Sequence, residues 1–328
     1  MRPERGECYE SYAGTIKRRA VPSDRAGEAD ADTAASGDTM RTMRILITGG
    51  EGQFSRALEH SLRSHDVIAL SHAQLDVADA SSFDAKVAAH SPEIVIHTAA
   101  LTDTTRCERE PHVAELINAR GTENAAEACR RHSAKLIAIS TNEVFDGTKR
   151  EPYIENDEPK AINAYGRSKL LGEEYARRTL PGKESIVRTS WVYGDGTNNY
   201  VAKVLAAARA GRPLRFATDE IAAPTSTHDL ADAISKLVGR DRPPGIYHLS
   251  NSGEASRYEW AREIIRLAGI DAAVTAVTTD ELRAEGYAGP RKPAYSTLAN
   301  TRAAALGITL RPWREALAAQ FERANVGG

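Results

Sequence analysis

The residues best suited to chemistry in this sequence are a tyrosine and a lysine one helical turn apart. Tyr165 and Lys169 lie four positions apart within residues 163–178, whose pattern predicts a helix, so both side chains share one face. A tyrosine with its ordinary pKa of about 10 is a poor acid at neutral pH. A neighbouring ammonium group stabilises the phenolate and lowers that pKa, which prepares the hydroxyl for proton transfer.

Two hydroxyl side chains at the end of a predicted strand are expected to act together with Tyr165 and Lys169. Ser140 ends the apolar run 135–140, and Thr141 follows it directly. Ligands of open α/β sheets bind at the carboxyl ends of the strands, so a hydroxyl there can hydrogen-bond the substrate oxygen that Tyr165 protonates. The combination is therefore more informative than the tyrosine and lysine alone.

A glycine turn precedes both features. Gly49 and Gly52 have GxxG spacing, directly after the apolar run 44–48 and before the amphipathic stretch 53–63. Glycines at such a turn serve steric needs or let the backbone approach a pyrophosphate at a helix N-terminus. Its place in the first strand–helix unit favours a dinucleotide site.

Residues farther along the chain bear on the choice of cofactor. Ser71 ends the second apolar run, where a carboxylate would hydrogen-bond the adenosine ribose of NAD. Serine does not repel a 2′-phosphate, so NADP(H) is favoured, with NAD(H) as the alternative. Asp76, in Leu75-Asp76-Val77, either meets the adenine amino group or is a solvated loop residue.

The elements that must position these residues alternate regularly. Predicted helices separate short apolar runs at 44–48, 67–70, 94–97, 135–140 and 185–188. This alternation predicts a doubly wound, parallel, Rossmann-type α/β sheet with helices on both faces. We expect residues 43–190 to form an NAD(P)-binding Rossmann domain. Residues 191–328 are expected to form mainly a smaller, mixed α/β substrate-binding lobe, with the final elements packing back on the sheet.

Composition excludes several classes of protein. The 328 residues include 43 Lys and Arg against 45 Asp and Glu, so nucleic acid is not expected as a partner. No apolar run approaches the roughly 20 residues of a membrane span. Cys8, Cys107 and Cys129 form no CxxC motif, and reduced thiols fit a cytoplasmic protein. The nine histidines lack metal-ligand spacing, so no metal site is expected.

Residues 1–42 differ from the remainder in composition. They hold few large apolar side chains, too few to offset the entropy of ordering the segment. They also lack the apolar stretch of a signal peptide. We therefore expect a disordered N-terminal extension, with Met40 or Met43 as the start of the functional protein.

The order of glycine turn, strand-end hydroxyl and YxxxK resembles that of the extended short-chain dehydrogenase/reductase superfamily, from residue 43 to near the end. Finer motifs resemble the dTDP-4-dehydrorhamnose reductase family within it. The matching stretches are Gly52-Gln53, Leu75-Asp76-Val77, Asn118 in Ile-Asn-Ala-Arg-Gly-Thr, Val144-Phe145-Asp146-Gly147, Tyr165-Gly166-Arg167-Ser168-Lys169-Leu170, Arg188-Thr189-Ser190-Trp191-Val192-Tyr193-Gly194, Ala223-Pro224-Thr225 and Pro293-Ala294-Tyr295-Ser296-Thr297-Leu298.

The resemblance implies NAD(P)H-dependent reduction of the C4 keto group of a dTDP-linked 4-keto-6-deoxy sugar, with dTDP-4-dehydro-L-rhamnose converted to dTDP-L-rhamnose. It implies that Tyr165 is the general acid, Thr141 the oxyanion partner, and Lys169 the holder of the nicotinamide ribose. Thr141, Asn142 and Trp191 would contact the nucleotide sugar, and a homodimer is an expected assembly. The implied cofactor contacts are Gly49, Gly52, Gln53, Phe54, Ser71, Asp76, Val77, Ala100, Leu101, Thr102, Tyr165 and Lys169.

Several residues depart from that family's pattern, among them the segment His97-Thr98-Ala99-Ala100-Leu101, where it has Asn-Ala-Ala-Ala-Tyr. Asn142 and Glu143 stand where it has Asp and Tyr, and Lys292 and Ala299 where it has Arg and Asp. An Asp-Glu pair after the threonine is typical of sugar-nucleotide 4,6-dehydratases, but Asn142 cannot donate the proton that dehydration needs. The remaining alternatives are a reductase or epimerase of another nucleotide sugar, and a non-catalytic NADP-binding subunit like the regulatory subunit of methionine adenosyltransferase.

Overall fold

The computed structural model describes residues 41–239 and 243–326. The predicted extension, residues 1–42, and Cys8 therefore lie outside the described residues, apart from Arg41 and Thr42. The described residues all belong to one compact unit.

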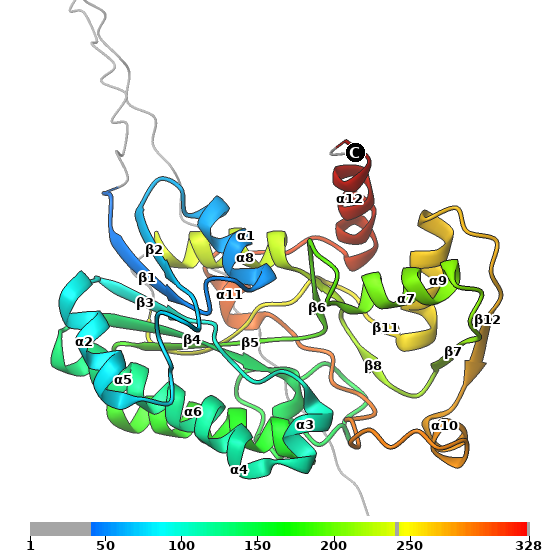
Figure 1. Ribbon diagram of the computed structural model, residues 1–328, viewed down its shortest axis with the longest axis horizontal. Coiled ribbons are helices and arrows are strands. Elements are labelled where there is room, and N and C mark those ends of the chain that lie inside the picture. Colours follow the sequence, from blue (N-terminus) through cyan, green and yellow to red (C-terminus); the bar gives the residue numbers. More distant parts are fainter. Residues whose placement is uncertain (1–40, 240–242, 327–328) are drawn as a thin grey trace, which may run out of the picture. The chain divides into compact units, whose positions relative to one another are not determined.

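A parallel sheet of six strands forms the centre of the described chain (Figure 1). The strand order is β10-β5-β4-β3-β1-β2, and every neighbouring pair is parallel. The strands are β1 (Arg44–Thr48), β2 (Asp66–Leu70), β3 (Ile94–His97), β4 (Lys135–Thr141), β5 (Glu184–Thr189) and β10 (Gly245–His248). The doubly wound parallel sheet predicted from the sequence is thus confirmed.

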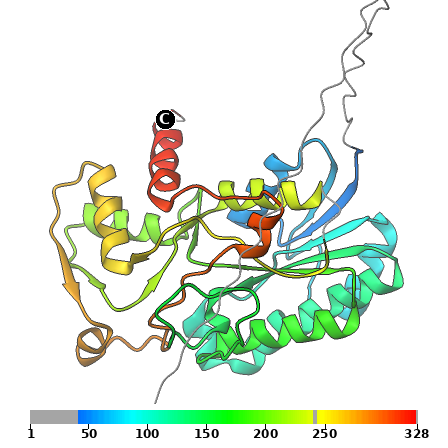
Figure 2. The ribbon, with the colours of Figure 1, turned by 180° about the vertical axis from the view of Figure 1, so that it is seen from behind.

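Helices cover both faces of the sheet, which explains why its strands are almost continuously apolar. Alternate residues of β1 enter different cores: Ile45 and Ile47 face one side and Leu46 the other. One face packs α1 (Gln53–Ser61), α8 (Thr227–Val238) and α11 (Thr301–Ala305), and the other packs α2 (Ala80–His90), α5 (Gly121–Arg131) and α6 (Ala164–Thr179). Figure 2 shows the same two layers from behind.

The helical stretch between β3 and β4 is divided rather than continuous. It contains α4 (Pro111–Ala114), the π-helical segment η1 (Glu115–Arg120) and then α5. A short helix, α3 (Thr104–Arg109), precedes them, and a 3-10 turn, η2 (Asn142–Val144), follows β4. Single π-turns within a helix are frequent at functional sites.

The smaller lobe is a mixed group of short strands and helices. Tyr193 and Trp260 lie at its core and are fully buried. Its elements are β6 (Val192–Tyr193), α7 (Tyr200–Arg209), β7 (Leu214–Ala217), β8 (Ile221–Ala222), β9 (Thr225–Ser226), β11 (Ala255–Ser256), α9 (Arg257–Leu267), β12 (Val274–Val277), α10 (Thr279–Ala284) and α12 (Trp313–Val326). Because β10, α8 and α11 belong to the sheet layers, the chain passes between lobe and sheet more than once.

None of the helices in the described part of the chain has the length and apolar character needed to cross a bilayer.

A buried ion pair joins β5 to β4 and α6, the strand and the helix that carry the predicted catalytic residues. Arg188 on β5 and Glu173 on α6 are 0% and 1% exposed. Two hydrogen bonds link them, from Nε to Oε1 at 2.9 Å and from Nη2 to Oε2 at 2.7 Å. Ser140 on β4 also donates to Glu173, and the guanidinium lies 5.1 Å from the ring centre of Phe145.

We expect Arg188→Met to lower the free energy of unfolding by about 3–5 kcal/mol, because it leaves the Glu173 carboxylate buried and unpaired. Urea unfolding measures the change. The double variant Arg188→Met/Glu173→Gln should lose less stability than Arg188→Met alone, since no charge is then stranded.

The matched control is Arg130→Met, which breaks an exposed pair with Glu127. Its expected cost is about 0–1 kcal/mol. Equal losses for Arg188→Met and Arg130→Met would show that the buried pair does not hold the fold.

Candidate active site

The three residues of the predicted catalytic set line one cavity of about 730 Å³. Tyr165 lies in the first turn of α6, Lys169 one turn later, and Thr141 at the carboxyl end of β4. Helix α6 begins where expected because Asn163 caps it, its Oδ1 accepting from the backbone N–H of Gly166 at 2.8 Å. Strand and helix thus bring together groups 24 or more positions apart in the sequence.

Burial controls the protonation of Tyr165. Burial first, and then the charge of Glu143, raise the pKa of Tyr165 above its ordinary value, while a hydrogen bond with Thr141 acts in the opposite direction. The prediction that Lys169 lowers this pKa below its usual value is therefore wrong for this structure. A phenol that stays protonated is suited to act as an acid toward an alkoxide, which is a stronger base.

Lys169 is also buried, at 5% exposure. Burial lowers its pKa to about 8, and the charge of Glu173, one turn farther along α6, partly opposes that shift. The same lysine charge, added to burial, lowers the pKa of His97 to about 3. His97 is therefore neutral near pH 7, and its Nδ1 lies 2.9 Å from Oγ1 of Thr48.

The glycine turn has the geometry of an anion cradle. Gly49 has φ +71°, and a Cβ there would lie 3.1 Å from Cα of Ala99, so a side chain would be strained and crowded. Gly52 precedes α1 and provides no side-chain cap, which leaves the first N–H groups of the helix for a ligand. Ser55, in place of a third glycine, donates to the carbonyl of Gly49 at 2.8 Å and fixes the turn.

A second cavity of about 400 Å³ lies beside the turn, with mainly apolar walls. Its lining includes five of the predicted cofactor contacts: Gly49, Asp76, Val77, Ala100 and Leu101. Phe54, Thr102 and Ala100 line the larger cavity. Gln53 begins α1 and accepts a hydrogen bond from Asn199 at 3.3 Å. Ser71 lines neither of these two cavities, and its N–H donates to Gln74 in the turn after β2.

The π-helical segment η1 positions the wall between the two cavities. Its Asn118 is fully buried and hydrogen-bonds both the N–H and the carbonyl of Leu101, at 2.8 and 3.1 Å. The same side chain donates to Ser168 on α6 at 2.9 Å. Asn118 therefore fixes the segment that contains Leu101 relative to the helix that carries Tyr165.

Both other predicted substrate residues line the larger cavity. Asn142 donates to Oγ of Ser296 at 2.7 Å, so its amide is already partly engaged. Trp191 follows β5 with φ +41°, an unusual conformation for a bulky side chain. The guanidinium of Arg257 lies 3.5 Å from its ring centre and holds the ring from one side.

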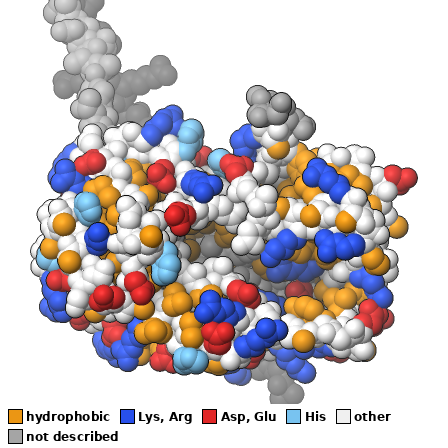
Figure 3. Space-filling model, viewed as in Figure 1, with side chains coloured by type: hydrophobic (Ala, Val, Ile, Leu, Met, Phe, Trp, Pro, Cys, Tyr) orange, Lys and Arg blue, Asp and Glu red, His pale blue; other side chains and the backbone are white. Residues whose placement is uncertain are grey.

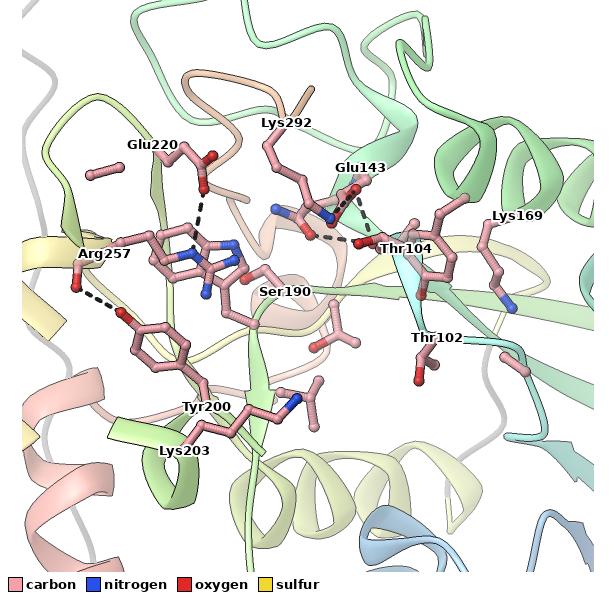
Figure 4. Close-up of a pocket in the computed structure, with 18 of the residues that line it drawn as sticks. Thr102, Thr104, Glu143, Lys169, Ser190, Tyr200, Lys203, Glu220, Arg257 and Lys292 are labelled. Atoms are coloured by element: carbon pink, nitrogen blue, oxygen red, sulfur yellow. Dashed lines mark hydrogen bonds and ion pairs between the residues drawn. The ribbon is translucent and has the colours of Figure 1, made fainter. Parts of the chain in front are cut away.

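Sequence reasoning missed the charged residues that the lobe contributes. Lys203, Arg215 and Arg257 line the same cavity as Thr141 and Tyr165, together with Tyr200 and Phe216. Figure 4 shows Lys203, Tyr200 and Arg257 on one side of the cavity and Lys169 on the other. Figure 3 shows lysine and arginine side chains gathered on the lobe's side of the hollow in this face. No motif marks these residues, because they come from separate short elements.

The chain is similar to known proteins over most of its length. The chain is 42% identical over 278 residues to the spore coat polysaccharide biosynthesis protein SpsK of Bacillus subtilis, covering 84% of this chain and 95% of that protein. It is 37% identical to a dTDP-4-dehydrorhamnose reductase of Mycolicibacterium smegmatis, covering 84% of each chain.

A crystal structure of a dTDP-4-dehydrorhamnose reductase from Bacillus anthracis, in complex with NADP, superimposes with a TM-score of 0.80 at 33% identity. The match covers 86% of this chain and 99% of that one. The sequence profile of the RmlD substrate binding domain matches residues 43–326. This chain therefore belongs to the RmlD substrate binding domain family.

Proposed function

We infer that this chain is an NADPH-dependent reductase of the C4 keto group of a dTDP-linked 4-keto-6-deoxy sugar, with dTDP-4-dehydro-L-rhamnose as the expected substrate. The observation that carries the proposal is the placement of Thr141, Tyr165 and Lys169 in the lining of one cavity, with Thr141 at the carboxyl end of β4. The relatives named as dTDP-4-dehydrorhamnose reductases, and the NADP complex of one of them, support the same reaction.

The residues present fit a dinucleotide. The uncapped N-terminus of α1 and the backbone at Gly49 would hold the pyrophosphate, and the apolar cavity at Val77 and Leu101 would take the adenine, with Asp76 at its amino group. Lys169 would bind the nicotinamide ribose. Bound NADPH supplies the hydride for the reduction of C4.

The chain's own part in the reaction is to hold and move a proton. A keto oxygen placed within about 3 Å of both hydroxyl groups accepts hydrogen bonds from Thr141 and Tyr165. As negative charge develops on that oxygen, Tyr165 transfers its phenolic proton and Thr141 keeps its hydrogen bond. Solvent then restores the proton to Tyr165, while Lys169 holds the nicotinamide ribose.

The lobe supplies the recognition of the nucleotide. A diphosphate needs cations, and Lys203, Arg215 and Arg257 provide three within the cavity. Trp191 and Tyr200 add aromatic faces beside them. We propose that the diphosphate binds against these cations, with the sugar extending toward Thr141.

The compartment and the assembly are further parts of the proposal. Cys107 and Cys129 are free and buried, which fits the reducing cytoplasm. The near balance of 43 basic and 45 acidic residues gives no reason to expect nucleic acid as a partner. The homodimer stays a prediction, which sedimentation of the purified chain tests.

The alternative function is an epimerase with the same fold, and one measurement distinguishes it from a reductase. A UDP-glucose 4-epimerase from Thermotoga maritima shares the fold at 20% identity. An epimerase returns the hydride to its substrate and oxidises no added NADPH. A reductase consumes NADPH in proportion to the dTDP-4-dehydro-L-rhamnose supplied, which absorbance of the nicotinamide measures.

Removal of the acid should abolish most of the activity. Tyr165→Phe is expected to lower kcat by about 10²–10⁴-fold, because general acid catalysis contributes about that factor. The steady-state rate of NADPH oxidation measures this. Tyr175→Phe, the same change in a half-buried tyrosine of α6, is the control and should leave kcat unchanged. Normal turnover by Tyr165→Phe would refute the mechanism.

The rate should also depend on the charge of Lys169. Because burial lowers its pKa to about 8, the ammonium is present below that pH and lost above it. We expect kcat/KM to fall as the pH rises through about 8, a profile that reports the free enzyme. Lys169→Arg, whose charge persists, should move the fall to higher pH even if the overall rate is lower. An unchanged profile in Lys169→Arg would exclude Lys169 as the titrating group.

A further inference from the structure

An ion pair in the larger cavity is not among the groups that donate a proton or a hydrogen bond to the keto oxygen in the proposed reaction. The Nζ of Lys292 lies 2.7 and 3.0 Å from the two carboxylate oxygens of Glu143, and the two side chains are 14% and 10% exposed. Both residues line the cavity, and Figure 4 shows them side by side near its catalytic end. The desolvation cost of a pair this well buried is not fully offset by its mutual attraction, so stability alone explains it poorly.

The pair lies close to the reacting groups. Glu143 follows Thr141 by two positions in the turn η2, and its N–H donates to Oγ1 of Thr141 at 3.2 Å. The charge of Glu143 also contributes to raising the pKa of Tyr165. The backbone of Glu143 therefore lies beside Thr141, and its charge is near enough to Tyr165 to affect the pKa of that group.

Neighbouring groups hold the pair in position. Asn163, the cap of α6, donates to Oε2 of Glu143 at 2.8 Å and to the carbonyl of Arg291 at 2.9 Å. The segment that carries Lys292 packs tightly, because a Cβ at Gly147 would lie 2.6 Å from the N of Ala294. The ion pair is thus a preorganised feature of the cavity wall.

The pair retains hydrogen-bonding capacity. Within residues 41–239 and 243–326, Nζ of Lys292 has no acceptor other than Glu143, although an ammonium group has three donors. The carboxylate of Glu143 likewise offers about four lone-pair positions. The two side chains together can donate to and accept from a ligand hydroxyl.

The chemistry of the sugar decides which ring position suits the pair. In a 4-keto-6-deoxy hexose, the carbons beside C4 are C3, which has a hydroxyl, and C5, which has a methyl group. An ion pair covered by a methyl group loses water and gains nothing, whereas a hydroxyl replaces the lost water. The C1 end carries the diphosphate and is directed toward the cations of the lobe.

We propose that the Glu143–Lys292 pair binds the C3 hydroxyl of the keto sugar and makes that hydroxyl a requirement for efficient reduction. The proposal rests on the proposed function and names two further specificity-determining residues for it. The pair selects against 3-deoxy sugars, because such a substrate leaves a desolvated ion pair without a partner.

The experiment compares dTDP-4-dehydro-L-rhamnose with its synthetic 3-deoxy analogue. The parent chain should show kcat/KM about 10–100-fold higher for the 3-hydroxy substrate, the range expected for one hydrogen bond to a charged group. In the double variant Glu143→Gln/Lys292→Met this ratio should fall severalfold or more, mainly through a higher KM for the 3-hydroxy substrate. The double variant removes both charges, so neither is left buried and unpaired.

Two further variants distinguish recognition from a structural role. Lys292→Arg keeps the cation and its donors, so it should preserve most of the ratio. Lys149→Met breaks a comparable pair with Asp157, 2.6 Å apart and outside the lining of the cavity, and should leave the ratio unchanged. Thermal unfolding of each variant reports its stability separately.

Each remaining outcome contradicts the proposal. If the parent chain reduces both sugars equally well, the function stands and the C3 specificity is wrong. The same conclusion holds if the double variant keeps the parent's ratio, or if it loses activity equally toward both sugars. If the parent chain oxidises NADPH with neither sugar, the proposed function itself fails and the specificity proposal fails with it.

Discussion

The geometry of the site depends on the buried pair of Arg188 and Glu173. Glu173 lies one turn beyond Lys169 on α6, and it is bonded to β5 through Arg188 and to β4 through Ser140, the neighbour of Thr141. Apolar side chains of similar volume would pack as well and would cost less desolvation. Apolar side chains would not fix the orientation of α6, however. A bidentate guanidinium does, because it fixes how far α6 is rotated and translated relative to the strands. The positions of Tyr165 and Lys169 relative to Thr141 depend on that constraint.

The same pair sets the electrostatics of the cavity. The charge of Glu173 is shared with Arg188, so it only partly offsets the effect of burial on Lys169, whose pKa is lowered to about 8. Burial acts in the opposite sense on Tyr165 and raises its pKa. The two shifts have one cause, because low polarity favours the neutral form of each group. The site therefore keeps a proton on the phenol and makes the lysine charge sensitive to nearby anions.

Local patterns explain what could be predicted from the sequence. The strands of the sheet alternate with helices, the glycine turn directly joins β1 to α1, and the Tyr165–Lys169 spacing lies within α6. Hydrophobic periodicity and position in the chain were therefore sufficient to predict these features. Other features required the fold. Glu143 and Lys292 are 149 positions apart, and Arg257 meets Trp191 only through packing in the lobe. The pKa of Tyr165 was predicted in the wrong direction because burial, the largest cause, is not readable from residue spacing. Ser71 follows β2, where a residue that contacts the adenosine ribose is expected, but its N–H donates to Gln74 within the next turn.

The sheet side of the cavity carries the proposed catalytic residues, and the lobe side carries the cations proposed to bind the nucleotide. Trp191 lies between these two sides. It is the second residue after β5, and its carbonyl accepts from Thr225 in β9 at 3.2 Å. A positive φ at a bulky residue costs of order 1–3 kcal/mol, so surrounding contacts must hold it. Arg257 on one side and the stacked ring of Trp260, 5.6 Å away, provide such contacts from the lobe. Arg257 also lines the cavity, so the residue that stacks against Trp191 is part of the cavity wall. The stack therefore joins the wall of the cavity to the core of the lobe.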